Sequence, residues 1–388
     1  MRKLPILILL IFLLVSCSSP EEIPNDSQSV TDETTVLDEM VEEDQAQPVQ
    51  EEVDPLQSRA VEMLEEMTLE EKIGQMFLVA CPENDVEEIQ KYNFGGIVLF
   101  ADDFRNSTPD EIIERVTECQ TASKIPLFVA VDEEGGTVSR VGRFSQFRAT
   151  PFLSPRDTFA KYGWQGIEED AKDKAELLTS LGINLNLAPV CDLSSNQSDF
   201  IYKRSFSGKA EEAAQFVSLA VTTMKNGGLM TALKHFPGYS SNADTHTTIS
   251  YDDRTLSDFI NADYQPFIAG IQAGSPFVMV SHNIITFFED KPASLSGAVH
   301  EELGRLGFDG LIMTDDLAMS GITQFTDGES TAVLAVLAGN HVLCTSSYEE
   351  EYADVLSAVK SGEISEELID GAVIKILKTK MEYGLIND

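Results

Sequence analysis

Basic residues are scarce in this 388-residue chain. Lysine and arginine together number 27, against 65 aspartates and glutamates, so the formal net charge is −38. A protein this acidic repels phosphate backbones and anionic lipid headgroups, which argues against binding of nucleic acid and against peripheral binding to a membrane surface. Neutral or cationic small molecules remain as partners.

The N-terminal apolar run is too short for a comfortable membrane span. The run, LPILILLIFLLV, follows Arg2 and Lys3 and ends at LVSC, residues 14–17. A basic start followed by a short apolar run is typical of a cleaved export signal. The LVSC ending resembles the lipobox of bacterial lipoproteins, which implies cleavage after residue 16, lipidation of Cys17 and an exported, lipid-anchored protein. An ordinary secretory signal is the alternative.

Residues 18–57 contain no lysine or arginine. They carry 13 acidic residues among Ser, Thr, Gln and Pro, a composition that cannot bury a core. We therefore expect a signal peptide (1–16), a lipid-anchored, disordered acidic tether (17–57) and a folded body (58–388).

Cysteines are few and show no CxxC or metal-ligand spacing. This excludes a disulfide framework and gives no support for a structural metal site. Apart from Cys17, the cysteines lie in or beside apolar stretches and are predicted to be small buried core residues: Cys81, Cys119, Cys191 and Cys344. An exported location permits a disulfide without requiring one.

Neither a GxGxxG fingerprint nor a GxxxxGK[ST] loop occurs, so no motif supports a nucleotide-binding open sheet. Instead, short apolar runs alternate with amphipathic segments throughout the body. This alternation predicts a parallel sheet that is buried on both faces. The runs are residues 76–80, 95–100, 126–132, 183–192, 229–236, 276–282, 310–316 and 341–346.

Most of these runs end in polar residues, among them Asp132, Asp192, Lys234, His282 and Asp316. In a (β/α)8 barrel the active site lies where the strands end, so polar residues at many strand ends favour a barrel. An open doubly wound sheet, the alternative, would concentrate them near one switch point. We predict an α/β fold with a single (β/α)8 TIM-type barrel domain.

The loop KHFPGYSSNADTHTTIS, residues 234–250, combines several groups that can transfer protons or bind hydroxyls. Asp244 is two residues from His246, close enough to fix the imidazole tautomer for general acid/base catalysis. A solvated loop in which both residues cap the backbone is the alternative. Lys234 and His235 can hydrogen-bond ligand hydroxyls, although Lys234 can equally belong to a structural ion pair.

Two other segments bring carboxylates to strand ends. GLIMTDD delivers Asp315 and Asp316, and because side chains alternate along a strand only one of them can point into the barrel mouth. That one would be a nucleophile or a metal ligand, but no HxH or second carboxylate cluster supports a metal. PLFVAVDEEGGTVSR places Asp132 before a glycine turn and Arg140 after it.

Taken together and in order, VDEEGG, APV-CD, RSFS, KHFPG with DTH, VMVSH and TDDLAM resemble family 3 glycoside hydrolases, in the β-N-acetylglucosaminidase branch with an Asp-His dyad. The resemblance runs from EEMTLEEKIGQMF (65–77) to AVIKILKTKMEYGL (372–385).

The resemblance implies roles for single residues. Asp315 matches the catalytic nucleophile, which leaves Asp316 in a supporting role. His246 matches the general acid/base, with Asp244 as its orienting partner. The positions that match substrate-binding residues of the family are Asp132, Arg140, Arg204, Lys234 and His235. No metal or organic cofactor is implied.

The sequence departs from the family pattern at Thr137, where arginine is usual, and at Tyr239 and Ser240, where the family has histidine and glycine. The resemblance implies a retaining exo-β-N-acetylglucosaminidase that acts on terminal β-linked N-acetylglucosamine of cell-wall or chitin-type oligosaccharides. The carbohydrate is the expected partner, the membrane is contacted only through the N-terminal lipid, and we expect a monomer. A phosphorylase and a non-catalytic sugar-binding lipoprotein are the alternatives.

Overall fold

The structure, a computed structural model, describes residues 54–239, 244–245 and 248–387. The predictions for the signal peptide, for Cys17, for most of the tether and for His246 fall outside these residues. The first helix begins at Pro55, ahead of the boundary expected at residue 58, because Asp54 caps it by accepting a hydrogen bond from the Leu56 backbone N–H.

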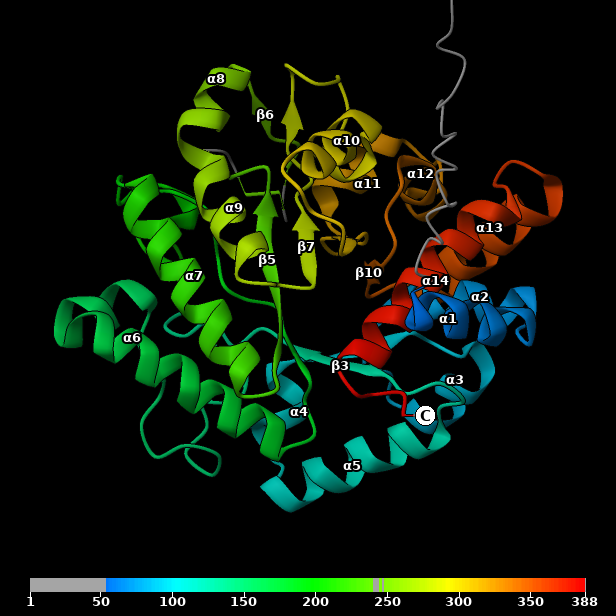
Figure 1. Ribbon diagram of the computed structural model, residues 1–388, viewed down its shortest axis with the longest axis horizontal. Helices are drawn as coiled ribbons and strands as arrows, with labels where there is room; N and C mark the ends of the chain where they lie inside the picture. The colour runs from blue at the N-terminus through cyan, green and yellow to red at the C-terminus, as the bar shows by residue number, and fades with distance from the viewer. Residues whose placement is uncertain (1–53, 240–243, 246–247, 388) are drawn as a thin grey trace, which may run out of the picture. The chain divides into compact units, whose positions relative to one another are not determined.

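Eight parallel strands form the centre of the domain (Figure 1). They are hydrogen-bonded in the order β10-β1-β2-β3-β4-β5-β7-β9, and a parallel bridge between Met313 and Val342 joins β9 to the start of β10, which closes the ring. The strands are β1 (Phe77–Ala80), β2 (Gly96–Leu99), β3 (Phe128–Val131), β4 (Leu185–Asn186), β5 (Met230–Phe236), β7 (Phe277–Val280), β9 (Leu311–Thr314) and β10 (Leu343–Thr345). All eight predicted strands and the barrel are confirmed.

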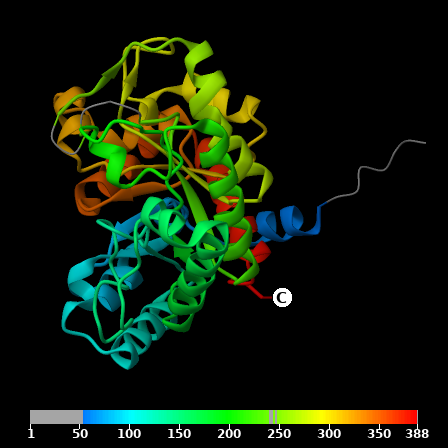
Figure 2. The same ribbon diagram turned by 90° about the vertical axis from the view of Figure 1, so that its left-hand side faces the viewer.

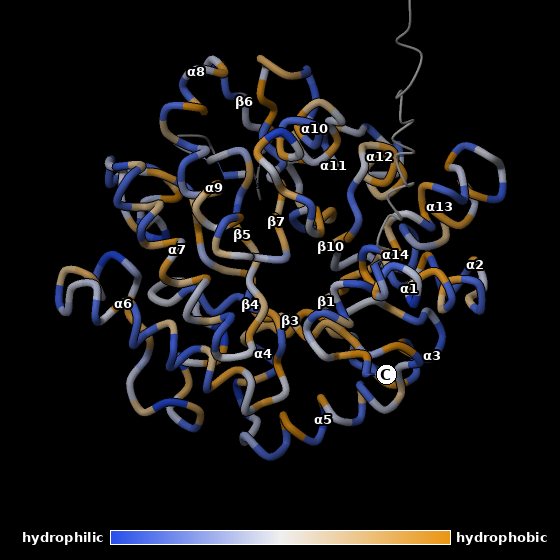
Figure 3. Tube along the Cα trace, viewed as in Figure 1, coloured by the Kyte–Doolittle hydropathy of each residue, from blue (hydrophilic) through white to orange (hydrophobic). Residues whose placement is uncertain are grey.

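The strand residues are apolar because helices cover their outer faces while neighbouring strands fill the barrel interior. Every residue of β2, β3, β7 and β9 is buried. Figure 3 shows β3 as a hydrophobic segment inside a ring of helices whose colours alternate between hydrophobic and hydrophilic.

Several helices begin at residues whose side chains cap them. Thr108 and Glu111 form a capping box at the start of α5, and Ser154, Ser296 and Ser365 cap α6, α10 and α14. The helices are α1 (Pro55–Glu65), α2 (Leu69–Gln75), α3 (Asp85–Tyr92), α4 (Ala101–Arg105), α5 (Pro109–Ala122), α6 (Pro155–Ser180), α7 (Ala210–Asn226), α8 (Leu256–Asp258), α9 (Tyr264–Gln272), α10 (Gly297–Arg305), α11 (Ser320–Thr326), α12 (Thr331–Ala338), α13 (Tyr348–Ser361) and α14 (Glu366–Glu382). The first and last helices, α1 and α14, pack side by side (Figures 1 and 2).

Shorter elements complete the fold. The 3₁₀ turns η1 (Phe200–Lys203) and η3 (Ala293–Leu295) and the π-helical turn η2 (Phe259–Asp263) lie in connections. A two-stranded parallel ribbon, β6 (Tyr251–Asp252) with β8 (Ile284–Ile285), pairs the segment after the Asp244 loop with the segment after β7. None of the helices in the described ranges combines the length and apolar character that crossing a membrane requires.

The cysteine prediction is confirmed for two residues only. Cys119 and Cys191 are buried, whereas Cys81 and Cys344 are half-buried. Cys344 differs from the prediction because it lines the cavity at the barrel mouth.

Candidate active site

A cavity of about 670 Å³ opens at the carboxyl ends of the barrel strands. Ala80, Asp132 and Met279 reach it from the ends of β1, β3 and β7, and Ser346 from the loop after β10. This one cavity is lined by the predicted site residues and by Asp316. The predicted residues are Asp132, Arg140, Arg204, Lys234, His235, Asp244 and Asp315. The structure therefore brings together every predicted site residue that it describes.

The end of β5 directs two consecutive side chains into the cavity. The pairing with β7 shifts between Lys234, opposite Met279, and Phe236, opposite Val280, so His235 occupies a bulge. A regular strand would point neighbouring side chains to opposite faces, and a bulge re-aims one of them. This irregularity explains how Lys234 and His235 can both line the cavity.

Lys234 is held by two carboxylates. Its Nζ lies 2.7 Å from Asp132 Oδ1 and 2.7 Å from Glu134 Oε1, and its side chain is 2% exposed. Burial alone would lower the pKa of Lys234, but the charges of Asp132 and Glu134 outweigh it and raise that pKa above its ordinary value. Lys234 is therefore a fixed cation. The structure confirms that it is ion-paired, and its binding of ligand hydroxyls stays a prediction for a residue that lines the cavity.

Glu134 links Lys234 to Arg204. The Arg204 guanidinium donates from Nε to Oε2 at 2.9 Å and from Nη2 to Oε1 at 2.8 Å, a bidentate pair. Burial acts to raise the pKa of Glu134, but the charges and hydrogen bonds of Arg204 and Lys234 hold it well below its usual value. Gly135 and Gly136, at φ 97° and 62°, make the turn that follows, which a side chain would strain.

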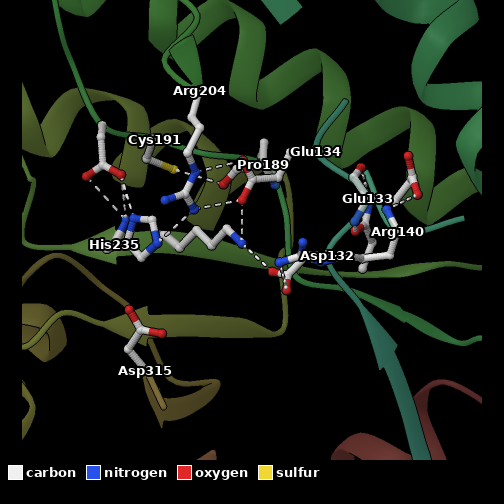
Figure 4. A network of polar contacts seen from close by, with 12 residues as sticks. Asp132, Glu133, Glu134, Arg140, Pro189, Cys191, Arg204, His235 and Asp315 are labelled. Carbon is white, nitrogen blue, oxygen red and sulfur yellow. Dashed lines mark hydrogen bonds and ion pairs between the residues drawn. The ribbon is translucent and has the colours of Figure 1, made fainter. Parts of the chain in front are cut away.

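His235 joins the network through both ring nitrogens (Figure 4). Arg204 Nη2 lies 3.2 Å from Nε2, and Asp192 Oδ2 lies 2.7 Å from Nδ1. A guanidinium can only donate, so Nε2 accepts and the proton is on Nδ1, where it is donated to Asp192. Asp192 also accepts from the Tyr239 backbone N–H at 2.8 Å, which fixes the start of the loop that carries Asp244.

Glu133 and Asp132 position Arg140. Glu133 Oε2 accepts from the backbone N–H groups of residues 140, 141 and 142 at 2.9, 2.7 and 3.1 Å, and the Ser139 hydroxyl donates to Glu133 Oε1. Arg140 Nη2 lies 3.5 Å from Asp132 Oδ2. The glycine turn after β3 thus presents a further cation to the cavity, besides Lys234 and Arg204.

Asp315 follows β9 and lines the same cavity as His235, near which Figure 4 shows it. Its Oδ1 accepts from the Asp316 backbone N–H at 2.9 Å. The Asp316 carboxylate accepts from the Ala318 backbone N–H at 2.9 Å and from the Ser346 N–H and hydroxyl at 3.1 and 3.0 Å. Asp316 therefore binds the local turn and the loop after β10, and its supporting role stays a prediction.

Sequence reasoning did not assign Glu134 and Asp192 to the site. Both lie in motifs that carry the family resemblance, Glu134 in VDEEGG and Asp192 at the end of APV-CD. Nothing in the local sequence, however, distinguishes Glu134 from Glu133. Their partners are distant in the chain: Arg204 lies 70 residues from Glu134, and His235 lies 43 from Asp192. In the part of the chain that the structure describes, no three His, Cys, Asp or Glu residues are grouped as metal ligands.

Comparison with known proteins gives consistent results. Residues 68–379 match the family described as the glycosyl hydrolase family 3 N terminal domain. "Beta-hexosaminidase A" of Pseudoalteromonas piscicida is 28% identical over 335 residues, 78% of this chain and 56% of that protein. "Beta-hexosaminidase" of Idiomarina loihiensis is 32% identical over 271 residues, 68% of this chain and 79% of that protein.

Two solved structures share the fold at similar identity. A glycoside hydrolase family 3 β-N-acetylglucosaminidase from Paenibacillus sp. str. FPU-7 has a TM-score of 0.76 at 29% identity, covering 83% of this chain and 64% of its own. A β-N-acetylhexosaminidase from Beutenbergia cavernae has a TM-score of 0.72 at 29% identity, covering 81% and 99%. The chain thus spans less than two thirds of the Pseudoalteromonas and Paenibacillus proteins. With a family match over most of its length, the chain belongs to glycosyl hydrolase family 3.

Proposed function

We propose that the protein is a retaining exo-β-N-acetylglucosaminidase that releases terminal β-linked N-acetylglucosamine from cell-wall fragments or chitin-type oligosaccharides. The observation that supports this most directly is that Asp315 shares one cavity with the ion-paired side chains of Asp132, Arg204 and Lys234. The names of the β-hexosaminidase relatives support the choice of sugar.

The network suits the recognition of a sugar ring. Ion pairs hold Lys234, Arg204 and Asp132 in place before any ligand arrives. These side chains therefore lose little conformational entropy when sugar hydroxyls bind to them. Charge-assisted hydrogen bonds from such groups suit vicinal hydroxyls and an acetamido group.

In the proposed reaction Asp315 attacks the anomeric carbon while His246 protonates the glycosidic oxygen that leaves. A water molecule then attacks the glycosyl-aspartate, and His246 takes its proton. Two inversions at the same carbon retain the configuration. Asp244, which lines the cavity, would orient the imidazole of His246.

The test is incubation of the full chain with an aryl N-acetylglucosaminide and an aryl glucoside, each with and without phosphate. We expect phenol release from the first substrate, independent of phosphate, and none from the Asp315→Ala variant, which controls for contaminating enzymes. Release of a sugar phosphate would identify the phosphorylase alternative. A folded protein that is inactive on both substrates but binds N-acetylglucosamine would support the binding-protein alternative.

We also propose that the protein is exported and anchored through lipid on Cys17. The support is the sequence alone: the basic start, the short apolar run and LVSC. Expression with a labelled fatty acid should label the protein in the membrane fraction, and Cys17→Ala should abolish the label. Labelling that persists in the variant would overturn the assignment.

A further inference from the structure

Tyr239 departs from the family pattern, in which histidine is usual at this position. Its side chain is 2% exposed and packs in a small apolar cluster with Val190 and Ile201. Its ring centre lies 5.6 Å from that of His235, in an edge-to-face arrangement. The fold therefore seats Tyr239 directly beside the sugar-binding network, although the proposed mechanism gives it no role.

The Tyr239 hydroxyl makes two hydrogen bonds to a single residue. Its Oη accepts from the Thr245 backbone N–H at 2.7 Å and lies 2.8 Å from Thr245 Oγ1, where either oxygen can donate. Thr245 is 0% exposed and stands between Asp244 and His246 in the sequence. Two bonds to one residue fix its orientation as well as its position. Tyr239 therefore holds the residue that joins the two members of the proposed Asp-His dyad.

The hydroxyl of Tyr239 keeps its proton near neutral pH. Burial raises the pKa of Tyr239 to about 12, the hydrogen bonds from Thr245 act against this rise, and the charges of Asp315 and Asp244 add to it. A protonated phenol can donate one hydrogen bond while it accepts another. Both bonds to Thr245 can therefore exist at the same time.

Thr245 is also bound by the segment that follows the candidate nucleophile. Its carbonyl oxygen accepts from the Gly321 N–H at 3.0 Å, near the start of α11. A Cβ on Gly321 would lie 2.5 Å from that oxygen, so this close approach requires glycine. The turn that leads into α11 is held by the Asp316 carbonyl, which accepts from the Met319 N–H at 3.0 Å. Thr245 thus links the loop to the turn after β9 as well as to Tyr239.

We propose that Tyr239 is a positioning residue for the acid/base step. By holding Thr245, it fixes where Asp244 and His246 stand relative to the sugar-binding network. The inference rests on the proposed function, in which His246 is the general acid/base, and Tyr239 itself exchanges no proton with the substrate. A catalytic group that is placed before the reaction loses less freedom in the transition state, which lowers the barrier.

The test is Tyr239→Phe, which removes the hydroxyl and keeps the ring. Single-turnover release of the leaving phenol, with enzyme in excess, is measured on a phenyl and on a dinitrophenyl N-acetylglucosaminide. We expect the rate on the phenyl substrate to fall about ten- to a hundredfold, as for a misplaced catalytic group. The rate on the dinitrophenyl substrate should fall much less, because an acidic phenol leaves with little help from an acid. A purely structural role would lower both rates by the same factor, so an equal fall, or no fall, would overturn the proposal.

A double-mutant cycle shows whether Tyr239 acts through the histidine. In the His246→Ala background, Tyr239→Phe should have little further effect on the phenyl substrate. The same fold loss in both backgrounds would mean that Tyr239 acts independently of His246, which contradicts the proposal even if His246 is the acid/base. Wild-type kinetics in His246→Ala alone would overturn the proposed function itself, and the inference with it.

Tyr264→Phe is the matched control. Tyr264 is 1% exposed, and its buried hydroxyl has no hydrogen-bond partner within the described residues. This variant removes the same atom and should leave both rates unchanged. A loss equal to that of Tyr239→Phe would show that the hydroxyl acts through packing alone, against the proposal.

Thr245→Val provides a second test if Tyr239→Phe does not fold. It removes Oγ1 and keeps the backbone N–H, so one of the two bonds to Tyr239 remains. We expect a smaller loss than in Tyr239→Phe, again confined mainly to the phenyl substrate. Equal losses on the phenyl and dinitrophenyl substrates would overturn the proposal here as well.

Discussion

Two side chains divide the proposed chemistry between them. Attack by Asp315 is needed whatever the leaving group, so Asp315→Ala should abolish turnover of natural and activated substrates without a burst. Protonation matters less for an acidic phenol, so His246→Ala should still form the glycosyl-enzyme from a dinitrophenyl substrate. Its hydrolysis still needs a base, which predicts a burst followed by a slow steady state. Stopped-flow phenol release, with mass detection of the intermediate on the Asp315 peptide, measures both.

Asp244→Asn is the graded comparison for this experiment. It keeps the imidazole and removes only the orienting charge, so both steps should weaken less than in His246→Ala. If His246→Ala behaves like the wild type on both substrate classes, His246 is not the general acid/base and instead caps the backbone of its loop.

Glu134 differs from these residues, because its carboxylate is buried and is paired with Arg204 and Lys234. Glu134→Gln would leave Arg204 and Lys234 with one carboxylate fewer, and removing one partner from a buried ion pair costs about 3–5 kcal/mol. We expect the free energy of unfolding to fall by about that amount and kcat/KM to fall as well, because both cations line the cavity. Chemical denaturation and steady-state kinetics measure the two effects.

The pH dependence adds a second readout for Glu134. Its pKa in the folded protein is depressed, so its contribution to stability is present above the pKa of the unfolded chain and is lost as the pH falls through the folded value. Acid unfolding should be less steep in Glu134→Gln than in the wild type. The control is Glu212→Gln, which removes a surface ion pair with Lys209 and should leave stability almost unchanged. Equal effects of the two variants would contradict the buried network.

At the scale of elements, long apolar runs were predictable and short irregular pieces were not. The apolar run at the start of residues 310–316 predicted a strand, and β9 (Leu311–Thr314) is there and buried throughout. The run at 183–192 was expected as one strand, but β4 covers only Leu185–Asn186, since Pro189 has no N–H to pair. The chain nevertheless continues beside β5, where Val190 bridges to Lys234. The ribbon β6–β8 pairs only two residues on each side, too few to show a period.

The same limit applies to the site. Asp315, Lys234 and His235 stood at strand ends and were identifiable from motifs. The bulge that allows Lys234 and His235 to face one cavity depends on pairing with β7, so it has no local signal. Likewise, the choice of Glu134 over Glu133 as the partner of Arg204 is made by the glycine turn and not by residue type.

The turn after β9 offers a test of how one element orients another. Asp316→Ala removes three hydrogen bonds, one to Ala318 and two to Ser346, and should lower the free energy of unfolding by about 2 kcal/mol. It should also lower kcat/KM, because the Asp316 N–H donates to Asp315 and the turn sets that geometry. Ser346→Ala removes only the hydroxyl contact and is the matched control, with a smaller effect on both quantities. Full activity in Asp316→Ala would show that the turn does not position Asp315.

At the scale of the whole domain, the two ends of the described chain meet around a buried charge. Lys380 of α14 is 0% exposed, donates to Gln75 Oε1 of α2 at 2.8 Å and lies 4.9 Å from the centre of the Phe128 ring of β3. Gln75 in turn donates to Asn93 O at 2.8 Å. Burial lowers the pKa of Lys380 from 10.5 to about 7, because its partners are dipoles and a ring.

This lowered pKa predicts a stability that rises with pH. Below about pH 7 the folded and unfolded chains both bind the proton, and the folded state carries the full cost of the buried charge. Between about pH 7 and 10.5 only the unfolded chain binds it, so the free energy of unfolding increases, by a few kcal/mol over the window. Lys380→Met removes the charge and keeps most of the volume, so it should be more stable than the wild type near pH 6 and should lose this slope. Denaturant unfolding of both proteins at several pH values is the measurement, with Lys360→Met, an exposed lysine paired with Glu70, as the control that keeps the slope. A wild type whose stability does not change across this window, or a Lys380→Met variant with an unchanged slope, would show that Lys380 does not control the pH dependence.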